Sequence, residues 1–544
     1  MAVRKQKLEL TWLGKDEGFK LEPRILIEDP NKSYGEPKSD NMLIHGDNLL
    51  ALKALEQDFT GKIKCIYIDP PYNTGNAFTK YDDNLEHSIW LSLMKPRLLL
   101  LKNLLSSDGV IFISIDDDEQ AYLKILCDEV FERKNFCGTF IWEKKRKPSF
   151  LNSQMGIITE YILSYAKNRL LAPGFIFGKV NEDETYPLYN AGNSRSILNF
   201  KQGSLRFLKH KDGIYEPQSF REETSNVVLI NQLVVENSVN KNDIKLEGEW
   251  RYGQDSIDEQ IEKGEYYIVK TLKFRPRRVL SNNLKEKKIH NLLDRAHFDM
   301  ATYEDSSVET VKLFGDDPFD YPKPEKLLFT LISSVTSKDD FVLDSFLGSG
   351  TTCAVAHKMG RKHIGIEFGN HANTHCLPRL KKVVDGTDNL PLSETIGWKG
   401  GGGFKFYNLA PSLLRKDNFG NLIIDSNYNP NQLSQAMCKH ESFRYFPDEK
   451  IYWKQGKSTE NDFIFVTTGF ITVEQLDKIH SEMKEEESLL ICAKSFAPEC
   501  ENKYSNITVK KIPQMILGKC EFSKDNYDLN IIKVTEDEAE KSNE

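Results

Sequence analysis

The chain has 544 residues, of which 39% are hydrophobic and 28% charged, and its mean hydropathy is −0.50. This composition is typical of a soluble globular protein and excludes a disordered chain. The longest apolar run, residues 98–105, is too short for a membrane-spanning helix, and the first residues lack the apolar core of a signal peptide, so we expect a cytoplasmic protein without membrane contacts. The net charge of −8 argues against nucleic-acid binding unless basic residues are concentrated locally.

Residues 1–40 are polar, contain three prolines and are expected to form an N-terminal arm. From residue 41 onward, short β-rich runs alternate with helical stretches. This alternation predicts an α/β fold with a doubly wound, mostly parallel sheet that has helices on both faces. The expected strands are 42–45, 63–68, 110–115, 139–142 and 161–165, and the expected helices are 49–55 and 87–105.

The alternation is lost between residues 170 and 317, which therefore look like an inserted module. It resumes with an expected helix at 323–334, a strand at 341–343, a helix at 351–359 and a strand at 363–367. We expect one α/β domain formed by residues 41–169 and 318–395, interrupted by the insert. Residues 396–544 are expected to form a small α/β C-terminal domain, because the segment 463–493 reads as strand, helix and strand.

Asp69-Pro70-Pro71-Tyr72 follows the expected strand 63–68 directly. In open α/β sheets, ligands bind outside the carboxyl ends of the strands. Prolines lack N–H groups, so the Asp69 carboxylate and the Pro70 carbonyl could accept both hydrogens of an amino group on a planar base, on which Tyr72 could stack. The alternative is a rigid turn without a catalytic role. The candidate catalytic residues are Asp69, Pro70, Pro71 and Tyr72.

A glycine-rich turn, DSFLGSGTT at residues 344–352, separates an expected strand from an expected helix. Its glycines let the backbone approach a ligand closely, and the helix start offers N–H groups to an anion. The turn lacks the lysine of a P-loop and the third glycine of a dinucleotide site, which leaves S-adenosylmethionine as the remaining ligand class. Glu367, at the end of the next expected strand, is placed like an acid that binds ribose hydroxyls, although a surface glutamate is the alternative.

The pair DPPY and FLGSGTT resembles the motif pair of the amino-methyltransferases of DNA, and its order resembles the β class of that family. Residues 46–49 (GDNL) are similar to the family segment that meets the cofactor adenine, and residues 321–324 (YPKP) resemble the segment beside the methionine moiety. The longer strings DPPYNTGN (69–76) and GWKGGGGFKFY (397–407) resemble the modification (Mod) subunit of type III restriction-modification systems.

This resemblance implies a Rossmann-like methyltransferase fold of permuted order and an S-adenosylmethionine-dependent transfer of a methyl group to N6 of a flipped-out adenine in a short asymmetric DNA site. Aspartate before the two prolines favours adenine over N4 of cytosine, by the family's habit. A homodimer and a restriction partner with motor and nuclease are also implied. No metal is expected. The candidate cofactor-binding residues are Asp47, Lys323, Asp344, Phe346, Gly348, Ser349, Gly350, Thr351, Thr352 and Glu367.

Three basic runs could contact DNA phosphates. Residues 270–295 hold nine Lys or Arg against two acids, residues 195–221 hold six against two, and residues 144–147 are all basic. Such runs are more often solvated faces, but beside methyltransferase motifs phosphate contact is favoured, and the insert is expected to recognise the target. The DNA-binding candidates are Lys144, Lys145, Arg146, Lys147, Lys273, Arg275, Arg277 and Arg278.

Other functions remain open at this point. The chain could be a stand-alone DNA methyltransferase, an N4-cytosine methyltransferase, an enzyme acting on an RNA base, or a DNA specificity subunit without catalysis. The C-terminal domain, residues 396–544, is expected to supply dimer or partner contacts.

Overall fold

The computed structural model describes residues 9–73, 87–148, 155–179, 185–222, 225–279 and 286–525, except residues 13, 17 and 19. The described residues form two compact units, one within 1–175 and 290–544 and the other within 176–289, and each is described by itself. None of the helices in these ranges is long and apolar enough to cross a membrane.

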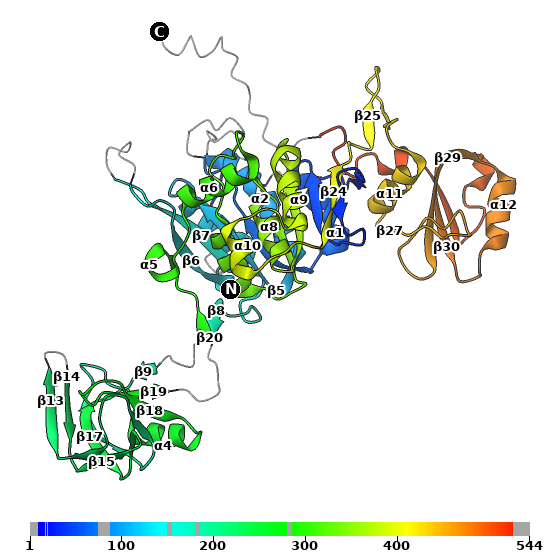
Figure 1. Cartoon of the computed structure of the whole chain (residues 1–544). Coiled ribbons are helices and arrows are strands. Elements are labelled where there is room, and N and C mark those ends of the chain that lie inside the picture. Colours follow the sequence, from blue (N-terminus) through cyan, green and yellow to red (C-terminus); the bar gives the residue numbers. More distant parts are fainter. Residues whose placement is uncertain are drawn as a thin grey trace, which may run out of the picture. The chain divides into compact units, whose positions relative to one another are not determined.

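Eleven strands within the described ranges form the central sheet of the larger unit (Figure 1). The outer strands are mixed in direction: β7 (Thr159–Ala166) runs antiparallel to its neighbours β5 and β6 (Phe136–Glu143), and β21 (Leu292–Leu293) pairs parallel with β6. The fold is therefore α/β with a mostly parallel sheet, as expected. Its parallel middle has the order β24 (Gly403–Leu409), β3 (Met42–His45), β23 (Lys362–Glu367), β22 (Phe341–Asp344), β4 (Ile63–Ile68) and β5 (Leu105–Ile115).

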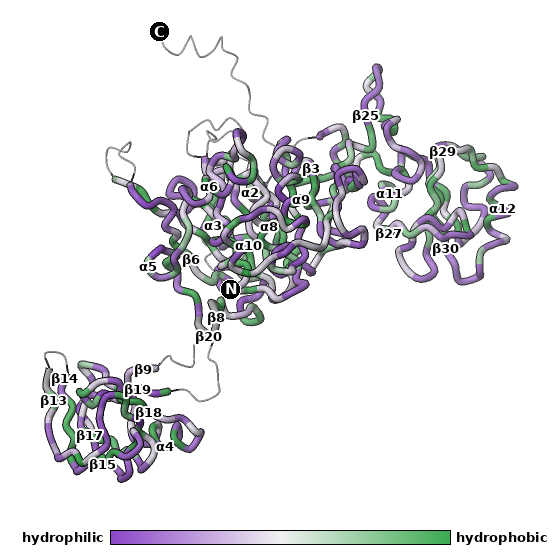
Figure 2. Tube along the Cα trace, viewed as in Figure 1, coloured by the Kyte–Doolittle hydropathy of each residue, from purple (hydrophilic) through white to green (hydrophobic). Residues whose placement is uncertain are grey.

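Helices cover both faces of this sheet. Successive strand residues point to opposite sides, so a strand of consecutive apolar residues needs a core on each face. On β3, Ile44 packs into one buried core and Leu43 into another. The hydropathy colouring of Figure 2 shows apolar segments along the strands between more polar outer segments. The first core includes α1 (Asn48–Phe59), α2 (His87–Leu104) and α3 (Gln120–Phe131), and α8 (Thr351–Lys358) and α9 (Leu377–Asp385) contribute to the second, next to α7 (Glu325–Val335).

The smaller unit is built mainly of antiparallel strands around its own core, which includes Phe200, Leu246 and Tyr267. One sheet has the order β10 (Arg195–Phe200), β17 (Ile244–Glu249), β14 (Ser225–Leu229) and β13 (Gln218–Glu222). The other sheet has the order β12 (Gly213–Tyr215), β15 (Leu233–Glu236), β16 (Val239–Asn240), β11 (Leu205–Phe207), β18 (Tyr266–Val269), β19 (Pro276–Val279) and β9 (Thr185–Pro187). The helix α4 (Gln254–Glu262) lies between β17 and β18 in the chain. The strands β8 (Ile176–Lys179) and β20 (Glu286–Lys288), at the two ends of this segment of the chain, pair with each other.

Three expected boundaries differ from the structure. The insert was expected over 170–317, but the compact unit spans 176–289, and α5 (Arg295–Phe298) and α6 (Tyr303–Phe314) belong to the larger unit. The expected N-terminal arm contributes β1 (Leu26–Glu28) and β2 (Tyr34–Gly35), which pair with β24. β24 itself was expected to lie in the C-terminal domain, yet it pairs with β3. Strands of two to seven residues at a sheet edge carry too short an apolar pattern to be assigned from sequence.

The C-terminal residues form a second, smaller sheet in the larger unit. Its order is β27 (Arg444–Tyr445), β28 (Gly456–Lys457), β29 (Asp462–Ile471), β30 (Ser488–Phe496) and β31 (Ile507–Lys511). The parallel pair β29 and β30 is joined by α12 (Val473–Glu482), as expected from the sequence. The remaining elements of this region are the hairpin β25 (Leu414–Lys416) and β26 (Leu422–Ile424), the helix α11 (Pro430–His440) and, before β24, the helix α10 (Pro391–Ile396).

Candidate active site

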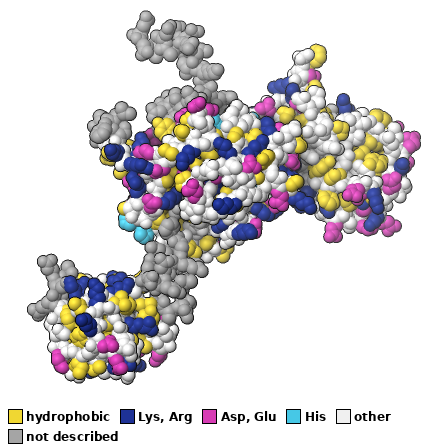
Figure 3. Space-filling view, in the orientation of Figure 1, with side chains coloured by type: hydrophobic (Ala, Val, Ile, Leu, Met, Phe, Trp, Pro, Cys, Tyr) yellow, Lys and Arg dark blue, Asp and Glu magenta, His cyan; other side chains and the backbone are white. Residues whose placement is uncertain are grey.

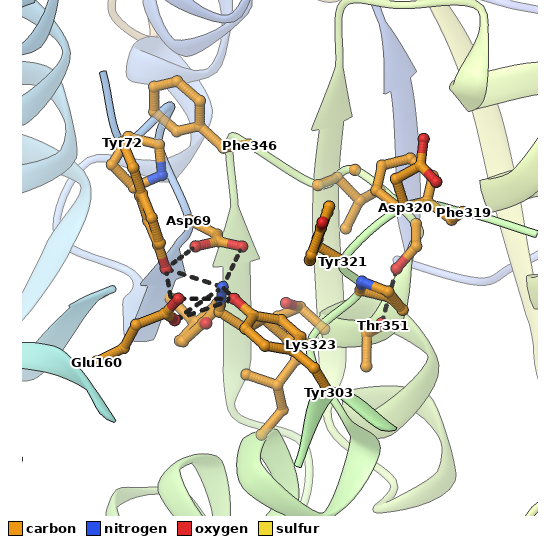
Figure 4. Close-up of a pocket in the computed structure, with 18 of the residues that line it drawn as sticks. Asp69, Tyr72, Glu160, Tyr303, Phe319, Asp320, Tyr321, Lys323, Phe346 and Thr351 are labelled. Carbon is orange, nitrogen blue, oxygen red and sulfur yellow. Dashed lines mark hydrogen bonds and ion pairs between the residues drawn. The ribbon is translucent and has the colours of Figure 1, made fainter. Parts of the chain in front are cut away.

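The two sequence motifs meet at one edge of the central sheet. β22 and β4 are parallel neighbours, with Val342 opposite Cys65 and Leu343 opposite Ile66. Because parallel strands end at the same edge, the DPPY turn after β4 lies beside the glycine turn after β22. Both turns line one pocket of about 340 Å³, a volume within the range of small-molecule sites (Figure 4).

Most of the predicted site residues line this pocket. Among them are the four catalytic candidates, Asp69, Pro70, Pro71 and Tyr72. Seven of the cofactor candidates also line it, namely Lys323, Asp344, Phe346, Gly348, Ser349, Thr351 and Thr352. Tyr321, from the YPKP segment that resembles the one beside the methionine moiety, lines it as well. The sequence prediction missed further lining residues, including Tyr67, Glu160, Tyr303, Phe319 and Asp320.

Three other cofactor candidates, Asp47, Gly350 and Glu367, are not among the lining residues. Asp47 caps helix α1 by accepting a hydrogen bond from the Leu50 amide at 2.9 Å. The buried carboxylate of Glu367 accepts the amide of Gly348 at 2.8 Å, so it holds the glycine turn. Gly350 has a φ of +83°, and a Cβ atom there would lie 3.2 Å from the Cα of Cys376.

Asp344 ends strand β22 and fixes the start of the glycine turn. Its carboxylate accepts the Phe346 amide at 2.9 Å and the Thr352 hydroxyl at 2.5 Å. Burial raises the pKa of Asp344 to about 7, although both hydrogen bonds oppose the shift. The turn is thus tied to both the strand that precedes it and the helix that follows it.

The DPPY turn is held by helix α2 and by the loop before α3. The Trp90 indole donates a hydrogen bond to the Pro71 carbonyl at 2.8 Å. Asn73 has a φ of +61°, and its side chain donates to the buried Glu119 carboxylate at 2.6 Å. Residues 74–76 of the expected DPPYNTGN string lie outside the described residues.

A buried lysine connects the catalytic candidates. The Lys323 ammonium lies 2.9 Å from the Asp69 carboxylate and 2.8 Å from each of the Tyr72 and Tyr303 hydroxyls. Burial opposes the charge of Lys323, but the Asp69 and Glu160 carboxylates raise its pKa overall. Burial likewise raises the pKa of Asp69, and Lys323 opposes that shift. Lys323, expected at the cofactor, therefore contacts the candidate catalytic carboxylate of Asp69.

Glu160 faces the same cluster from strand β7 (Figure 4). Its side chain is 4% exposed and accepts hydrogen bonds from Tyr72 at 3.1 Å, from Tyr303 at 3.0 Å and from Lys144 at 3.1 Å. β7 runs antiparallel to β5, with Tyr161 opposite Ile115, so the first residues of β7 reach the edge where the parallel strands end. No local motif marks Glu160, because its place depends on this strand reversal.

Several basic candidates for DNA contact are engaged within the protein. Lys144 and Lys145 line the pocket, and Lys144 pairs with Glu160. Arg146 pairs with Asp305 of α6. The larger unit thus binds part of this run to its own acids, which lie far away in sequence.

The basic candidates of the smaller unit differ in their surroundings: Arg277 and Arg278 bind acceptors of this unit, Lys273 lies at its surface and Arg275 lies near an aromatic ring. Arg278 pairs with Glu265 through its Nε and Nη2 donors, and Arg277 donates to the side chain and the carbonyl of Thr185 at 2.6 Å. Lys273 is exposed, and the Arg275 guanidinium lies 6.0 Å from the Tyr189 ring. Figure 3 shows Lys and Arg side chains gathered on one side of this unit.

Fold and site together define an α/β protein with a ligand pocket between neighbouring strands of a doubly wound sheet. The family model described as DNA methylase matches residues 63–375, more than half of the chain. The chain therefore belongs to the DNA methylase family, as the motif pair predicted.

Curated relatives agree with this assignment. The chain is 35% identical to the probable type III restriction-modification enzyme HindVI Mod subunit of Haemophilus influenzae, over 70% of this chain and 55% of the relative. It is 30% identical to the StyLTI Mod subunit of Salmonella typhimurium, over 63% and 55%, and 28% identical to the EcoPI Mod subunit of Escherichia phage P1, over 71% and 66%. The chain spans about half the length of the first two relatives.

Proposed function

We propose that this protein is an S-adenosylmethionine-dependent methyltransferase that methylates N6 of adenine in double-stranded DNA. One observation carries the proposal: the DPPY turn and the glycine turn, on adjacent parallel strands, line the same pocket. A carboxylate and a proline carbonyl at one turn suit an amino group, and the other turn suits a cofactor. The two reactants would then meet within one site.

The residues present fit S-adenosylmethionine, which when bound supplies a methyl group on a sulfonium centre. Gly348 has a φ of +55°, and a Cβ atom there would lie 3.3 Å from the Phe319 ring, so a side chain at this position would crowd the lining of the pocket. The start of α8 offers N–H groups to a carboxylate. The aromatic rings of Phe346 and Tyr321 suit a cationic centre.

The residues of the DPPY turn would orient the substrate amine. The lone pair of an exocyclic amine is delocalised into the purine ring, which makes the amine a poor nucleophile. Asp69 and the Pro70 carbonyl would accept its two hydrogens, favour sp³ character and aim the lone pair for in-line transfer. Tyr72 would stack on the base after it is flipped out of the duplex.

The smaller unit is the proposed target-recognition part, because Lys and Arg side chains gather on one of its sides (Figure 3). We further propose that the protein is the modification subunit of a type III restriction-modification system, as the names of its relatives suggest. It would then act in the cytoplasm as a homodimer with a restriction subunit, and its C-terminal residues would serve these contacts.

Incubation with radiolabelled S-adenosylmethionine and unmethylated genomic DNA tests the function, followed by identification of the modified nucleoside. N6-methyladenine is the expected product. N4-methylcytosine alone would overturn the choice of base, and label on RNA alone would overturn the choice of substrate. Cofactor binding without any transfer would favour a specificity subunit.

The variant Asp69→Ala tests the assigned chemistry. It should abolish transfer while calorimetry finds cofactor affinity within about threefold of the wild type. An equal loss of both would mean that Asp69 supports the fold and does not contact the amine.

A further inference from the structure

Glu160 is the one buried acid of the pocket that meets the DPPY tyrosine directly. Its two oxygens receive the Tyr72 and Tyr303 hydroxyls and the Lys144 ammonium, and Lys323 lies 3.5 Å away. Neither sequence motif contains Glu160. An acid with this many donors inside a substrate pocket needs an explanation beyond packing, because burying a carboxylate is costly.

The Tyr72 hydroxyl connects Glu160 to the catalytic carboxylate. Its oxygen lies 2.8 Å from Asp69 and 3.1 Å from Glu160. An ammonium group can only donate, so the Lys323 contact at 2.8 Å occupies a lone pair of the Tyr72 oxygen and leaves its single hydrogen to one of the two carboxylates. A small rotation of the O–H bond therefore switches the hydrogen between Asp69 and Glu160.

Resting on the proposed function, we propose that Glu160 is a positioning residue for methyl transfer. It accepts the Tyr72 hydrogen, so that Asp69 is open to the substrate amine, and it receives the proton that the amine releases. Tyr303 (Figure 4) and Lys144 hold the Glu160 carboxylate in place for both tasks.

Bonds, protons and electrons are conserved in this relay. The N6–CH₃ bond forms while the S–CH₃ bond breaks, and the sulfur keeps the electron pair and leaves as a neutral thioether. The amine nitrogen, now cationic, gives one proton to Asp69. Asp69 passes a proton to the Tyr72 oxygen as the Tyr72 hydrogen moves to Glu160. Asp69 is then a carboxylate again, Glu160 is protonated, and Lys323 keeps its charge throughout.

The electrostatic setting predicts how the relay responds to pH. Burial raises the pKa of Asp69, and the charge of Glu160 raises it further, whereas Lys323 lowers it. Loss of the Glu160 charge should therefore lower the pKa of Asp69. Because the ionised form of Asp69 is the active one, the acid limb of the rate profile would move to lower pH. The other titratable groups that line the pocket around this pair are Tyr67, Tyr72, Asp116, Lys144, Lys145, Tyr303, Asp320, Tyr321 and Asp344.

Glu160→Gln is the direct test, because it keeps the size of the side chain and removes its charge. We expect kcat for methyl transfer to genomic DNA to fall by about 10²-fold, the lower range for loss of a proton acceptor. Calorimetric affinity for S-adenosylhomocysteine should stay within about twofold, and the acid limb should move to lower pH. Glu143→Gln is the matched control: Glu143 stands on the adjacent strand β6, and its carboxylate accepts the Arg295 amide.

A second pair of variants separates the relay from packing. Tyr72 and Tyr303 each donate to Glu160 and accept from Lys323, but Tyr72 also reaches Asp69. Tyr72→Phe should therefore lower kcat about as much as Glu160→Gln, and Tyr303→Phe should lower it much less. This comparison decides the question even if Glu160→Gln does not fold.

The outcomes are distinguishable. Wild-type kcat in Glu160→Gln, an unmoved acid limb, or equal effects of the two phenylalanine variants would overturn the relay while the wild type still methylates DNA. A wild-type protein that transfers no methyl group would overturn the proposed function and the relay with it.

Discussion

Lys323→Met removes the ammonium group that lies between the partly buried Asp69 carboxylate and the buried Glu160 carboxylate, and it keeps the length of the side chain. The lysine is 5% exposed, 2.9 Å from Asp69 and 3.5 Å from Glu160. Removing one partner of a buried ion pair costs about 3–5 kcal/mol, because the remaining charge is left uncompensated. We expect the free energy of unfolding to fall by about this amount at pH 8.

The loss should depend on pH with a defined sign. Lys323 lowers the pKa of Asp69, so the variant raises it further above the value of the unfolded chain. A raised carboxyl pKa destabilises the folded state above that pKa, and the penalty disappears as pH falls through it. The variant should thus recover stability relative to the wild type between pH 8 and pH 5.

Urea denaturation of both proteins at the two pH values measures this difference. Lys326→Met is the control, because Lys326 pairs with Asp299 at the surface, where 41% and 90% of the two side chains are exposed. That variant should lose less than about 1 kcal/mol. A loss in Lys323→Met as small as in the control, or a loss that is equal at both pH values, would refute the reasoning.

Two further predictions concern the cofactor turn and the smaller unit. Gly350→Ala should destabilise the protein by about 1–2 kcal/mol, because its φ is positive. Gly397→Ala (φ +67°), which has open space around it, should destabilise the protein by a similar amount. Only Gly350→Ala should also weaken S-adenosylmethionine binding in calorimetry, because its methyl group would meet Cys376, which contacts the glycine turn. Lys273→Ala should weaken DNA binding and reduce the slope of log affinity against log salt concentration by about one. Arg278→Ala should mainly lower the melting temperature, because Glu265 already neutralises that arginine. Equal slopes for both variants would contradict this distinction.

The sequence alone predicted the features that depend on local chemistry. Consecutive prolines after a β-rich run, and glycines between a strand and a helix, mark turns whose conformation is set within a few residues. The α/β class and the position of the two motifs directly after β4 and β22 were therefore predicted correctly, whereas α3 and the strands β1, β2 and β24 were not expected. The family followed from the same two motifs, and the match over residues 63–375 confirmed it.

The tertiary structure decided which distant residues share the site. The pairing of β22 with β4 brings Asp344 next to the DPPY turn, and the reversal of β7 brings Glu160 to the same edge. Tyr303 reaches the site from α6, in a segment that was expected to belong to the insert. The partners of basic residues were equally hidden, since Lys144 meets Glu160 and Arg146 meets Asp305 only after folding. Long-range pairing of strands and charges is set by the packing of the whole sheet, so a local sequence pattern does not predict it.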